Sequence, residues 1–223
     1  MGNTVGSFGS LYLGVNNKAV RNLRNSLVLS PEQKSLVYGT MLGDGHIEGN
    51  AENRQKNFRL KINHSSKQKD LVFWKYKILK NFVLKSPKFT KINNSWGFRT
   101  ISHSEITKIK SIFYRGKKKI LPKNIEDILK DKLSLAAWYM DDGCKWISKS
   151  IERGLILNTQ SFDLDEINKL VELFIELYEI EPKIHRDHNK YRLHIRVKDQ
   201  YKFSDLFKDY IIDTLKYKLP KYP

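Results

Sequence analysis

The chain has very little of what small secreted proteins and membrane proteins depend on. Cys144 is the only cysteine among 223 residues, which excludes a disulfide framework and a cysteine-rich zinc site. No apolar run approaches the ~18 residues of a membrane-spanning helix, so we expect a soluble protein without a membrane partner. Acidic residues are also scarce: 24 Asp and Glu stand against 41 Lys and Arg, a formal net charge of +17.

This basic excess indicates a polyanionic partner. Apolar residues make up 40% and aromatic residues 12% of the chain, enough for a buried core and too much for a disordered polycation. Nucleic acid is the usual partner of such a protein. An acidic membrane surface is the weaker alternative, because the basic residues are spread over the whole chain instead of one amphipathic segment.

Residues 1–29 differ from the remainder of the chain. They hold no acidic residue, and the first carboxylate is that of Glu32. The segment is poor in arginine for a transit peptide and has no clear amphipathic pattern. We interpret it as an N-terminal arm.

The rest of the chain reads as a tandem repeat. Two short apolar segments, residues 36–45 and 135–143, contain Asp-Gly at their ends, and Asp44 precedes Asp142 by 98 residues. Other landmarks recur in the same order at an offset of 95, namely Ile62-Asn63 with Leu157-Asn158, Pro87-Lys88 with Pro182-Lys183, and Asn94 with Asn189. We therefore predict a first half over residues 30–122 and a second half over residues 123–223.

The hydrophobic pattern predicts helix, two strands, helix, two strands, helix in each half. Residues 57–62 and 191–197 alternate apolar with mostly basic side chains, which indicates sheets with one buried and one wet, basic face. Helix-start signals stand at Ser30 with Gln33 and at Asp163 with Glu166. We expect each Asp-Gly to end its helix through a left-handed glycine. The fold class is α+β.

The two Asp-Gly helices carry small residues that favour pairing. Gly39 in the first and Ala137 in the second allow two helix backbones to approach closely. Pairing would bring Asp44 and Asp142 together at the negative ends of two helix dipoles, an arrangement that requires a compensating cation. Oxygen ligands select a hard ion such as Mg²⁺, which suits phosphodiester hydrolysis.

Residues 37–45 and 135–143 resemble the two motifs of a LAGLIDADG homing endonuclease, of the single-chain type found in mitochondrial introns. The matching residues are Gly39, Asp44 and Gly45 in the first motif and Leu135, Ala136, Asp142 and Gly143 in the second. The first motif departs from the family pattern at Leu42 and Gly43. The resemblance covers about residues 30–220 and implies two pseudo-symmetric αββαββα halves, with antiparallel sheets that form a DNA-binding saddle and motif helices paired at the interface.

The resemblance also implies an activity, which is Mg²⁺-dependent cleavage of both strands of a long DNA site with 3′ overhangs. Mn²⁺ would substitute for Mg²⁺, and Ca²⁺ would support binding without cleavage. The implied catalytic residues are Asp44, Asp142, Lys119 and Lys218. The implied metal ligands are the carboxylates of Asp44 and Asp142 and the carbonyls of Gly43 and Asp141.

Polar residues of the expected wet face are candidates for DNA contacts, with phosphates supplying most affinity and base edges supplying sequence choice. The candidates are Arg59, Lys61, Lys88, Arg99, Asn158, Gln160, Lys183, Arg192, His194 and Arg196. Because the halves differ at most of these positions, we expect an asymmetric double-stranded target. Two halves in one chain predict a monomer.

Two other functions are compatible with this fold: an intron RNA maturase, which binds RNA without cutting, and a non-catalytic DNA-binding regulator. Both motif carboxylates are present, which favours cleavage and leaves a dual role open. The ratio of 31 Lys to 10 Arg fits an A+T-rich genome such as that of a fungal organelle. The single free cysteine fits a reducing interior. We therefore expect an intracellular, mitochondrial protein.

Overall fold

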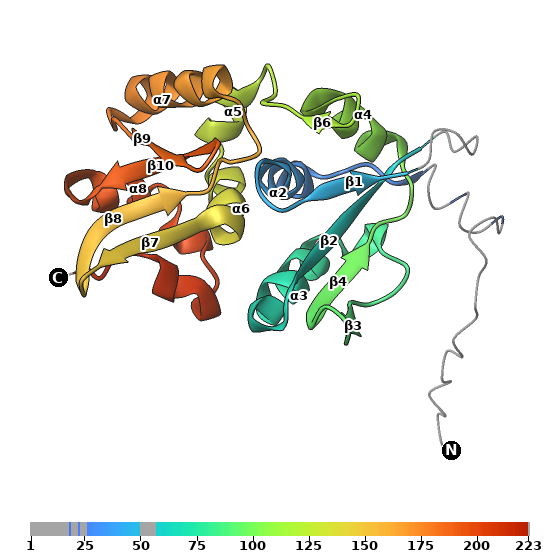
Figure 1. The fold of residues 1–223 in the computed structure, drawn as a ribbon. Coiled ribbons are helices and arrows are strands. Elements are labelled where there is room, and N and C mark those ends of the chain that lie inside the picture. Colours follow the sequence, from blue (N-terminus) through green and yellow to red (C-terminus); the bar gives the residue numbers. More distant parts are fainter. Residues whose placement is uncertain (1–17, 19–21, 23–25, 50–56, 223) are drawn as a thin grey trace.

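Two lobes lie on either side of a central helix pair in the computed structural model, which describes residues 18, 22, 26–49 and 57–222 (Figure 1). The pair consists of α2 (Pro31–Leu42) and α6 (Lys132–Asp142), which pack against each other. The predicted α+β class with antiparallel sheets is confirmed. The predicted arm over residues 1–29 lies largely outside the described residues.

The first lobe contains one four-stranded antiparallel sheet in the order β1-β2-β4-β3. Its elements after α2 are β1 (His46–Glu48), β2 (Arg59–Ser65), α3 (Lys69–Ile78), β3 (Lys88–Thr90), β4 (Ser95–Arg99) and α4 (Ser104–Phe113). A short hairpin of β5 (Tyr114–Arg115) and β6 (Lys118–Lys119) follows, and then α5 (Ile125–Lys130). The predicted boundary between residues 122 and 123 lies between β6 and α5.

The second lobe repeats this connectivity, with a sheet in the order β7-β8-β10-β9. Its elements after α6 are β7 (Gly143–Ser148), β8 (Ile151–Leu157), α7 (Leu164–Tyr178), β9 (Lys183–Asp187), β10 (Lys190–Arg196) and α8 (Gln200–Asp205). The helix and strand order predicted for each half is therefore present twice.

The two strands predicted from alternation are displaced in the structure. β2 begins at Arg59, because Phe58 forms only an isolated bridge with His103, and it continues to Ser65 because that end pairs with β4. β10 ends at Arg196, because Val197 begins a 3-10 helix. The side-chain alternation holds within the shifted β2.

The predicted helix starts are present as reciprocal caps. Ser30 Oγ accepts from the Gln33 N–H at 3.2 Å, and Gln33 Oε1 accepts from the Ser30 N–H at 3.1 Å. Asp163 and Glu166 exchange the same two bonds at 3.1 and 2.9 Å. Such caps satisfy backbone donors that the first helical turn leaves unpaired.

The prediction of left-handed glycines at the motif ends is wrong. Gly143 has φ −84°, Gly45 is not among the glycines with a positive φ, and α2 is already capped at Gly43, whose φ is −93°. Lack of a side chain is what these positions require: a Cβ on Gly143 would lie 2.3 Å from the ring of Tyr139.

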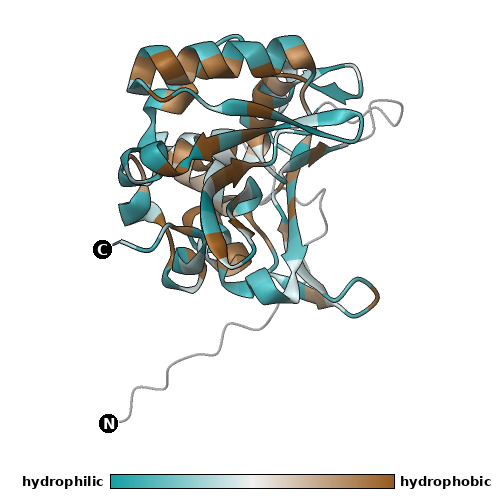
Figure 2. Ribbon diagram, turned by 60° about the vertical axis from the view of Figure 1, so that its left-hand side comes forward, coloured by the Kyte–Doolittle hydropathy of each residue, from teal (hydrophilic) through white to brown (hydrophobic). Residues whose placement is uncertain are grey.

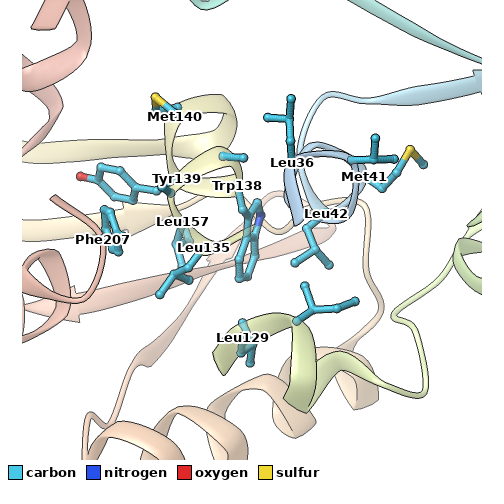
Figure 3. Close-up of a cluster of buried hydrophobic side chains, with 14 of the residues drawn as sticks. Leu36, Met41, Leu42, Leu129, Leu135, Trp138, Tyr139, Met140, Leu157 and Phe207 are labelled. Carbon is cyan, nitrogen blue, oxygen red and sulfur yellow. The ribbon is translucent and has the colours of Figure 1, made fainter. Parts of the chain in front are cut away.

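Close contact of α2 with α6 organises the core. A Cβ on Gly39 would lie only 2.0 Å from the carbonyl oxygen of Ser134, and Ser134 Oγ donates to the Ser35 carbonyl at 2.9 Å. Around this contact the two helices bury a continuous cluster that includes Leu36 and Trp138 (Figure 3). Figure 2 shows apolar residues concentrated toward the centre of the molecule. Within the described residues, no helix has both the length and the apolarity to cross a bilayer.

Candidate active site

The ends of the two central helices meet where the acidic residues of the repeat stand. Asp44 stands two residues after the end of α2, and its N–H donates to Oδ2 of Asp141 near the end of α6 at 3.3 Å. Asp142 is the last residue of α6, and its carboxylate is close enough to Asp44 for the two charges to interact. Close packing at Gly39 is what allows this meeting, because it lets the helices run side by side.

The two motif carboxylates have different electrostatic environments. Burial, together with the charges of Asp44 and Asp141, raises the pKa of Asp142 to about 8. A hydrogen-bonding contact with His64 (Nδ1 to Oδ2, 3.5 Å) keeps the pKa of Asp44 below its usual value. The Asp44 side chain is 50% exposed. One site acid is therefore held neutral near pH 7 unless a cation compensates its charge.

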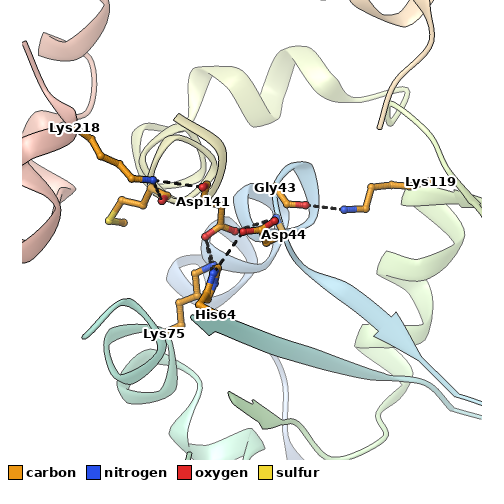
Figure 4. Close-up of polar contacts among 8 residues, drawn as sticks. Gly43, Asp44, His64, Lys75, Lys119, Asp141 and Lys218 are labelled. Carbon is orange, nitrogen blue, oxygen red and sulfur yellow. Dashed lines mark hydrogen bonds and ion pairs between the residues drawn. The ribbon is translucent and has the colours of Figure 1, made fainter. Parts of the chain in front are cut away.

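One lysine approaches the end of each central helix (Figure 4). Lys119 of β6 donates from Nζ to the Gly43 carbonyl at 2.7 Å. Lys218, the last residue of the 3-10 helix η6 (Asp213–Lys218), donates to the Met140 carbonyl at 2.6 Å and lies 3.4 Å from the Asp141 carbonyl. Burial lowers the pKa of both lysines. The structure therefore brings both predicted lysines to the predicted carboxylates.

The oxygen atoms at this junction fit a hard divalent cation. The junction offers the carboxylates of Asp44 and Asp142, which interact electrostatically, and the carbonyls of Gly43 and Asp141 beside them in the sequence. Over the described part of the chain, no group of three or more His, Cys, Asp or Glu side chains could hold a metal by themselves. A site with two carboxylates suits Mg²⁺, because this ion is bound by one or two protein carboxylates and keeps water or phosphate oxygens as its other ligands. The lysine bond to Gly43 leaves that carbonyl a second lone pair.

Three side chains beside Asp44 were not predicted from the sequence: His64, Lys75 and the carboxylate of Asp141. Lys75 of α3 is fully buried, with Nζ 2.6 Å from Asp141 Oδ1 and 3.5 Å from His64 Nε2. Asp141 was predicted to act only through its carbonyl. A signal existed, because Lys75 stands four residues after buried Leu71 on the apolar face of α3, where a lysine is unexpected.

The four DNA-contact candidates of the first lobe lie together. Arg59, Lys61, Lys88 and Arg99 all line one cavity of about 640 Å³ on the sheet. Glu48 of β1, which was not predicted, bonds to two of them, with Oε1 2.8 Å from Arg59 Nη2 and 2.6 Å from Arg99 Nε. The hollow is therefore lined by basic residues, and Glu48, outside its lining, holds two of their guanidinium groups.

The candidates of the second lobe are more heavily engaged with their own lobe. Lys183 and Arg196 both pair with Glu181, at 2.7 and 3.2 Å. Arg192 lies on the same face of β10 as Arg196, opposite His185 of β9.

Three further candidates of this lobe are committed to intramolecular contacts. Asn158 donates from Nδ2 to the Asp142 carbonyl at 2.8 Å, and Gln160 donates to Asp187 at 3.0 Å. His194 was expected on the exposed face but is buried, because Trp146 covers it with a ring-centroid distance of 4.7 Å. Asn158 thus supports the end of α6 itself.

Two repeated α+β lobes, whose paired helices end in acids beside a basic sheet face, define a nucleic-acid-processing enzyme. The chain belongs to the LAGLIDADG DNA endonuclease family, whose sequence profile matches residues 34–203. It is therefore a DNA-cleaving hydrolase, and the family resemblance drawn from the two motifs is confirmed.

Known proteins similar to this chain extend over most of its length. The probable intron-encoded endonuclease 1 of Wickerhamomyces canadensis is 29% identical over 219 residues, covering 94% of this chain and 93% of the relative. The solved homing endonuclease I-WcaI, bound to its DNA recognition sequence, is 28% identical with a TM-score of 0.83. That match covers 96% of this chain and 97% of the other.

Some relatives are named for a different function. The cytochrome b mRNA maturase bI2 of Saccharomyces cerevisiae is 27% identical over 209 residues, covering 84% of this chain. The match spans 47% of the maturase, so this chain corresponds to about half of that relative.

Proposed function

We propose that this protein is a homing endonuclease that cuts both strands of a long, asymmetric DNA site with Mg²⁺ held between Asp44 and Asp142. The observation that carries the proposal is the closeness of these two carboxylates, with Lys119 bonded to the Gly43 carbonyl and Lys218 to the Met140 carbonyl at the two helix ends. Two negative groups at two helix C-termini are unfavourable without a cation.

The residues that would hold the cation are Asp44 and Asp142, with the carbonyls of Gly43 and Asp141 in support. When bound, Mg²⁺ supplies an activated water and stabilises the leaving oxygen; Mn²⁺ would replace it, and Ca²⁺ would permit binding alone. Lys119 and Lys218 give up a proton more readily than surface lysines because burial lowers their pKa. Each can therefore exchange a proton close to the phosphate at its own end of the site.

DNA would lie across both sheets. The basic hollow of the first lobe offers four side chains to the phosphate backbone and base edges. The second lobe offers Lys183, Arg192 and Arg196, with neighbours different from those of the first lobe. Unlike surfaces on the two lobes support an asymmetric target, and the presence of both lobes in one chain supports a monomer.

The test uses a cleavable duplex recovered from a randomised DNA library. We expect Asp44→Asn and Asp142→Asn to abolish cleavage in Mg²⁺ and to retain binding in Ca²⁺ within about threefold, since the phosphate contacts lie elsewhere. Asp209→Asn, at an exposed position, is the matched control and should cut like the wild type. Full cleavage by either motif variant would contradict the shared cation.

Splicing of an intron RNA is a second candidate function, and the similarity to the bI2 maturase favours it. The intron-encoded and cytochrome b relatives also support an organellar origin. A variant dead for DNA cleavage, Asp142→Asn, separates the two activities. If it still promotes splicing of the intron that encodes this chain, the protein has both functions; if RNA binding is absent, only the endonuclease remains.

A further inference from the structure

The two central helices differ at the residue before the motif aspartate. Gly43 holds this position in the first motif and Asp141 holds it in the second. A Cβ on Gly43 would lie 2.6 Å from Cβ and 2.8 Å from Oδ2 of Asp141. The side chain of Asp141 therefore occupies the space that a side chain of the first motif would fill, and it reaches from the second lobe into the first.

Each oxygen of Asp141 has a partner in the first lobe (Figure 4). Oδ1 pairs with Lys75 Nζ at 2.6 Å and lies 3.6 Å from His64 Nε2. Oδ2 accepts the backbone N–H of Asp44 at 3.3 Å. Both charged side chains of the Lys75–Asp141 pair are 0% exposed. His64 completes the connection, since its Nδ1 lies 3.5 Å from Asp44 Oδ2.

The second half of the repeat lacks this ion pair and can be compared with the first half. At the 95-residue offset of the repeat, Leu170 stands where Lys75 is, and Thr159 stands where His64 is. Leu170 is fully buried in the core of α7, so an apolar residue fits this position of the fold. The ion pair thus belongs to one side of the pseudo-symmetric site.

Stability does not account for the pair. Removing two charges from water costs about as much as their attraction returns, and apolar replacements of similar volume are often neutral or stabilising. The second lobe has Leu170 at the position of Lys75. The Lys75–Asp141 pair therefore needs an explanation other than stability. Its contacts to the backbone and side-chain surroundings of Asp44 indicate that role.

We propose that Asp141, clamped by Lys75, is a positioning residue that crosses the lobe interface and fixes Asp44 for cleavage. This inference rests on the proposed metal-binding role of Asp44. Asp141 holds the Asp44 N–H, and His64 links the same pair to the Asp44 carboxylate. Among the described contacts, neither Leu170 nor Thr159 contacts Asp142 in a corresponding way. The Lys75–Asp141 pair therefore acts on the Asp44 side of the site.

A double-mutant cycle separates positioning from folding. The variants are Lys75→Leu, Asp141→Ala and the combined Lys75→Leu/Asp141→Ala. Each single change leaves one buried charge without its partner, so we expect the Tm in EDTA to fall by on the order of 10 °C. The double variant removes both charges and should recover most of that loss.

Cleavage should not recover with the Tm. At saturating selected duplex in Mg²⁺, well below each Tm, we expect all three variants to cut at least tenfold more slowly than the wild type. Affinity for the same duplex in Ca²⁺ should stay within threefold. A double variant that regains both Tm and wild-type rate would overturn the proposal, as would an equal loss of affinity and rate.

The matched control is an exposed pair outside the site, Lys130→Leu/Glu126→Ala in α5. It should leave rate and affinity unchanged. Failure of the proposed function is recognised separately: full cleavage by Asp44→Asn would remove Asp44 from the chemistry, whatever the Lys75 and Asp141 variants do.

Discussion

The hydroxyl of Tyr139 donates a 2.6 Å hydrogen bond to the backbone carbonyl of Lys218. Tyr139 is fully buried in α6 and packs on Phe207 with ring centroids 4.9 Å apart. The lysine returns to the same helix through its side chain, which donates to Met140. α6 therefore fixes both ends of Lys218, and the position of this lysine depends on a residue that is fully buried in the core.

We predict that Tyr139→Phe slows cleavage severalfold and lowers stability by ~1–2 kcal/mol, because a buried carbonyl loses its donor. Urea denaturation and single-turnover cleavage measure the two effects. Tyr178→Phe is the control: its hydroxyl donates to the Leu129 carbonyl, away from the site, so stability should fall and the cleavage rate should not. Equal rates for the two variants would contradict this role of Tyr139.

Replacement of Gly39 should separate the central helices. In Gly39→Ala the new methyl group would meet the Ser134 carbonyl, and overpacking of this kind costs ~1–3 kcal/mol or more. We expect a loss of at least ~3 kcal/mol in urea denaturation together with a large loss of cleavage, because Asp44 and Asp142 move apart. The reverse change at the partner position, Ala137→Gly, should cost only ~1 kcal/mol through helix propensity.

Glu48 should restrain DNA binding by the first lobe. Glu48→Gln releases Arg59 and Arg99, so we expect tighter binding to non-specific duplex in Ca²⁺ and a log–log salt slope steeper by ~1. Stability should change by less than ~1 kcal/mol, since the pairs are partly exposed. Fluorescence anisotropy at several salt concentrations measures the effect, with Glu126→Gln as control. An unchanged slope would place these arginines away from the phosphates.

The raised pKa of Asp142 predicts an inverse dependence of stability on pH in the metal-free protein. The native carboxyl keeps its proton up to about pH 8, whereas the unfolded one loses it near pH 4. Within that window the native state binds more protons, so stability falls as pH rises, by up to ~1.4 kcal/mol per unit from this group. Urea denaturation in EDTA measures it.

Asp142→Asn is the comparison for this effect. The variant should gain stability relative to the wild type between pH 5 and 8, with no further gain above pH 8. Mg²⁺ must displace the same proton, so its apparent affinity should rise through this window and level off above it. A pH-independent difference between variant and wild type would show that Asp142 is ionised throughout.

Local signals accounted for most of the fold. The caps at Ser30 and Asp163 depend on residues three positions apart, and the alternation in β2 depends on neighbours, so both can be predicted from short segments. Strand ends were less predictable: β2 continues to Ser65 because β4 pairs with it, which is a tertiary effect. The repeat supplied the connectivity of the whole chain.

The site was predictable only as far as the repeat extends. Asp44 and Asp142 recur in the two halves, and their order indicated a common place, whereas Lys119 and Lys218 were implied by the resemblance to the family. Lys75, His64 and the side chain of Asp141 have no counterparts, because the structure uses them once. Glu48 was equally hidden, since its two arginine partners come from different strands. Features that break the symmetry leave no repeated pattern to find.

The glycine at position 43 also bears on the ancestry of the chain. In a pair made of two first halves, a glycine would face a glycine, and the space that Asp141 now fills would be empty. In a pair made of two second halves, two aspartate side chains would compete for that one space. We therefore expect that neither half forms a stable pair with a second copy of itself. The two halves of the repeat have become complementary to each other at positions 43 and 141. Exchange of one half between related proteins should therefore succeed only when the residues at these two positions still fit each other.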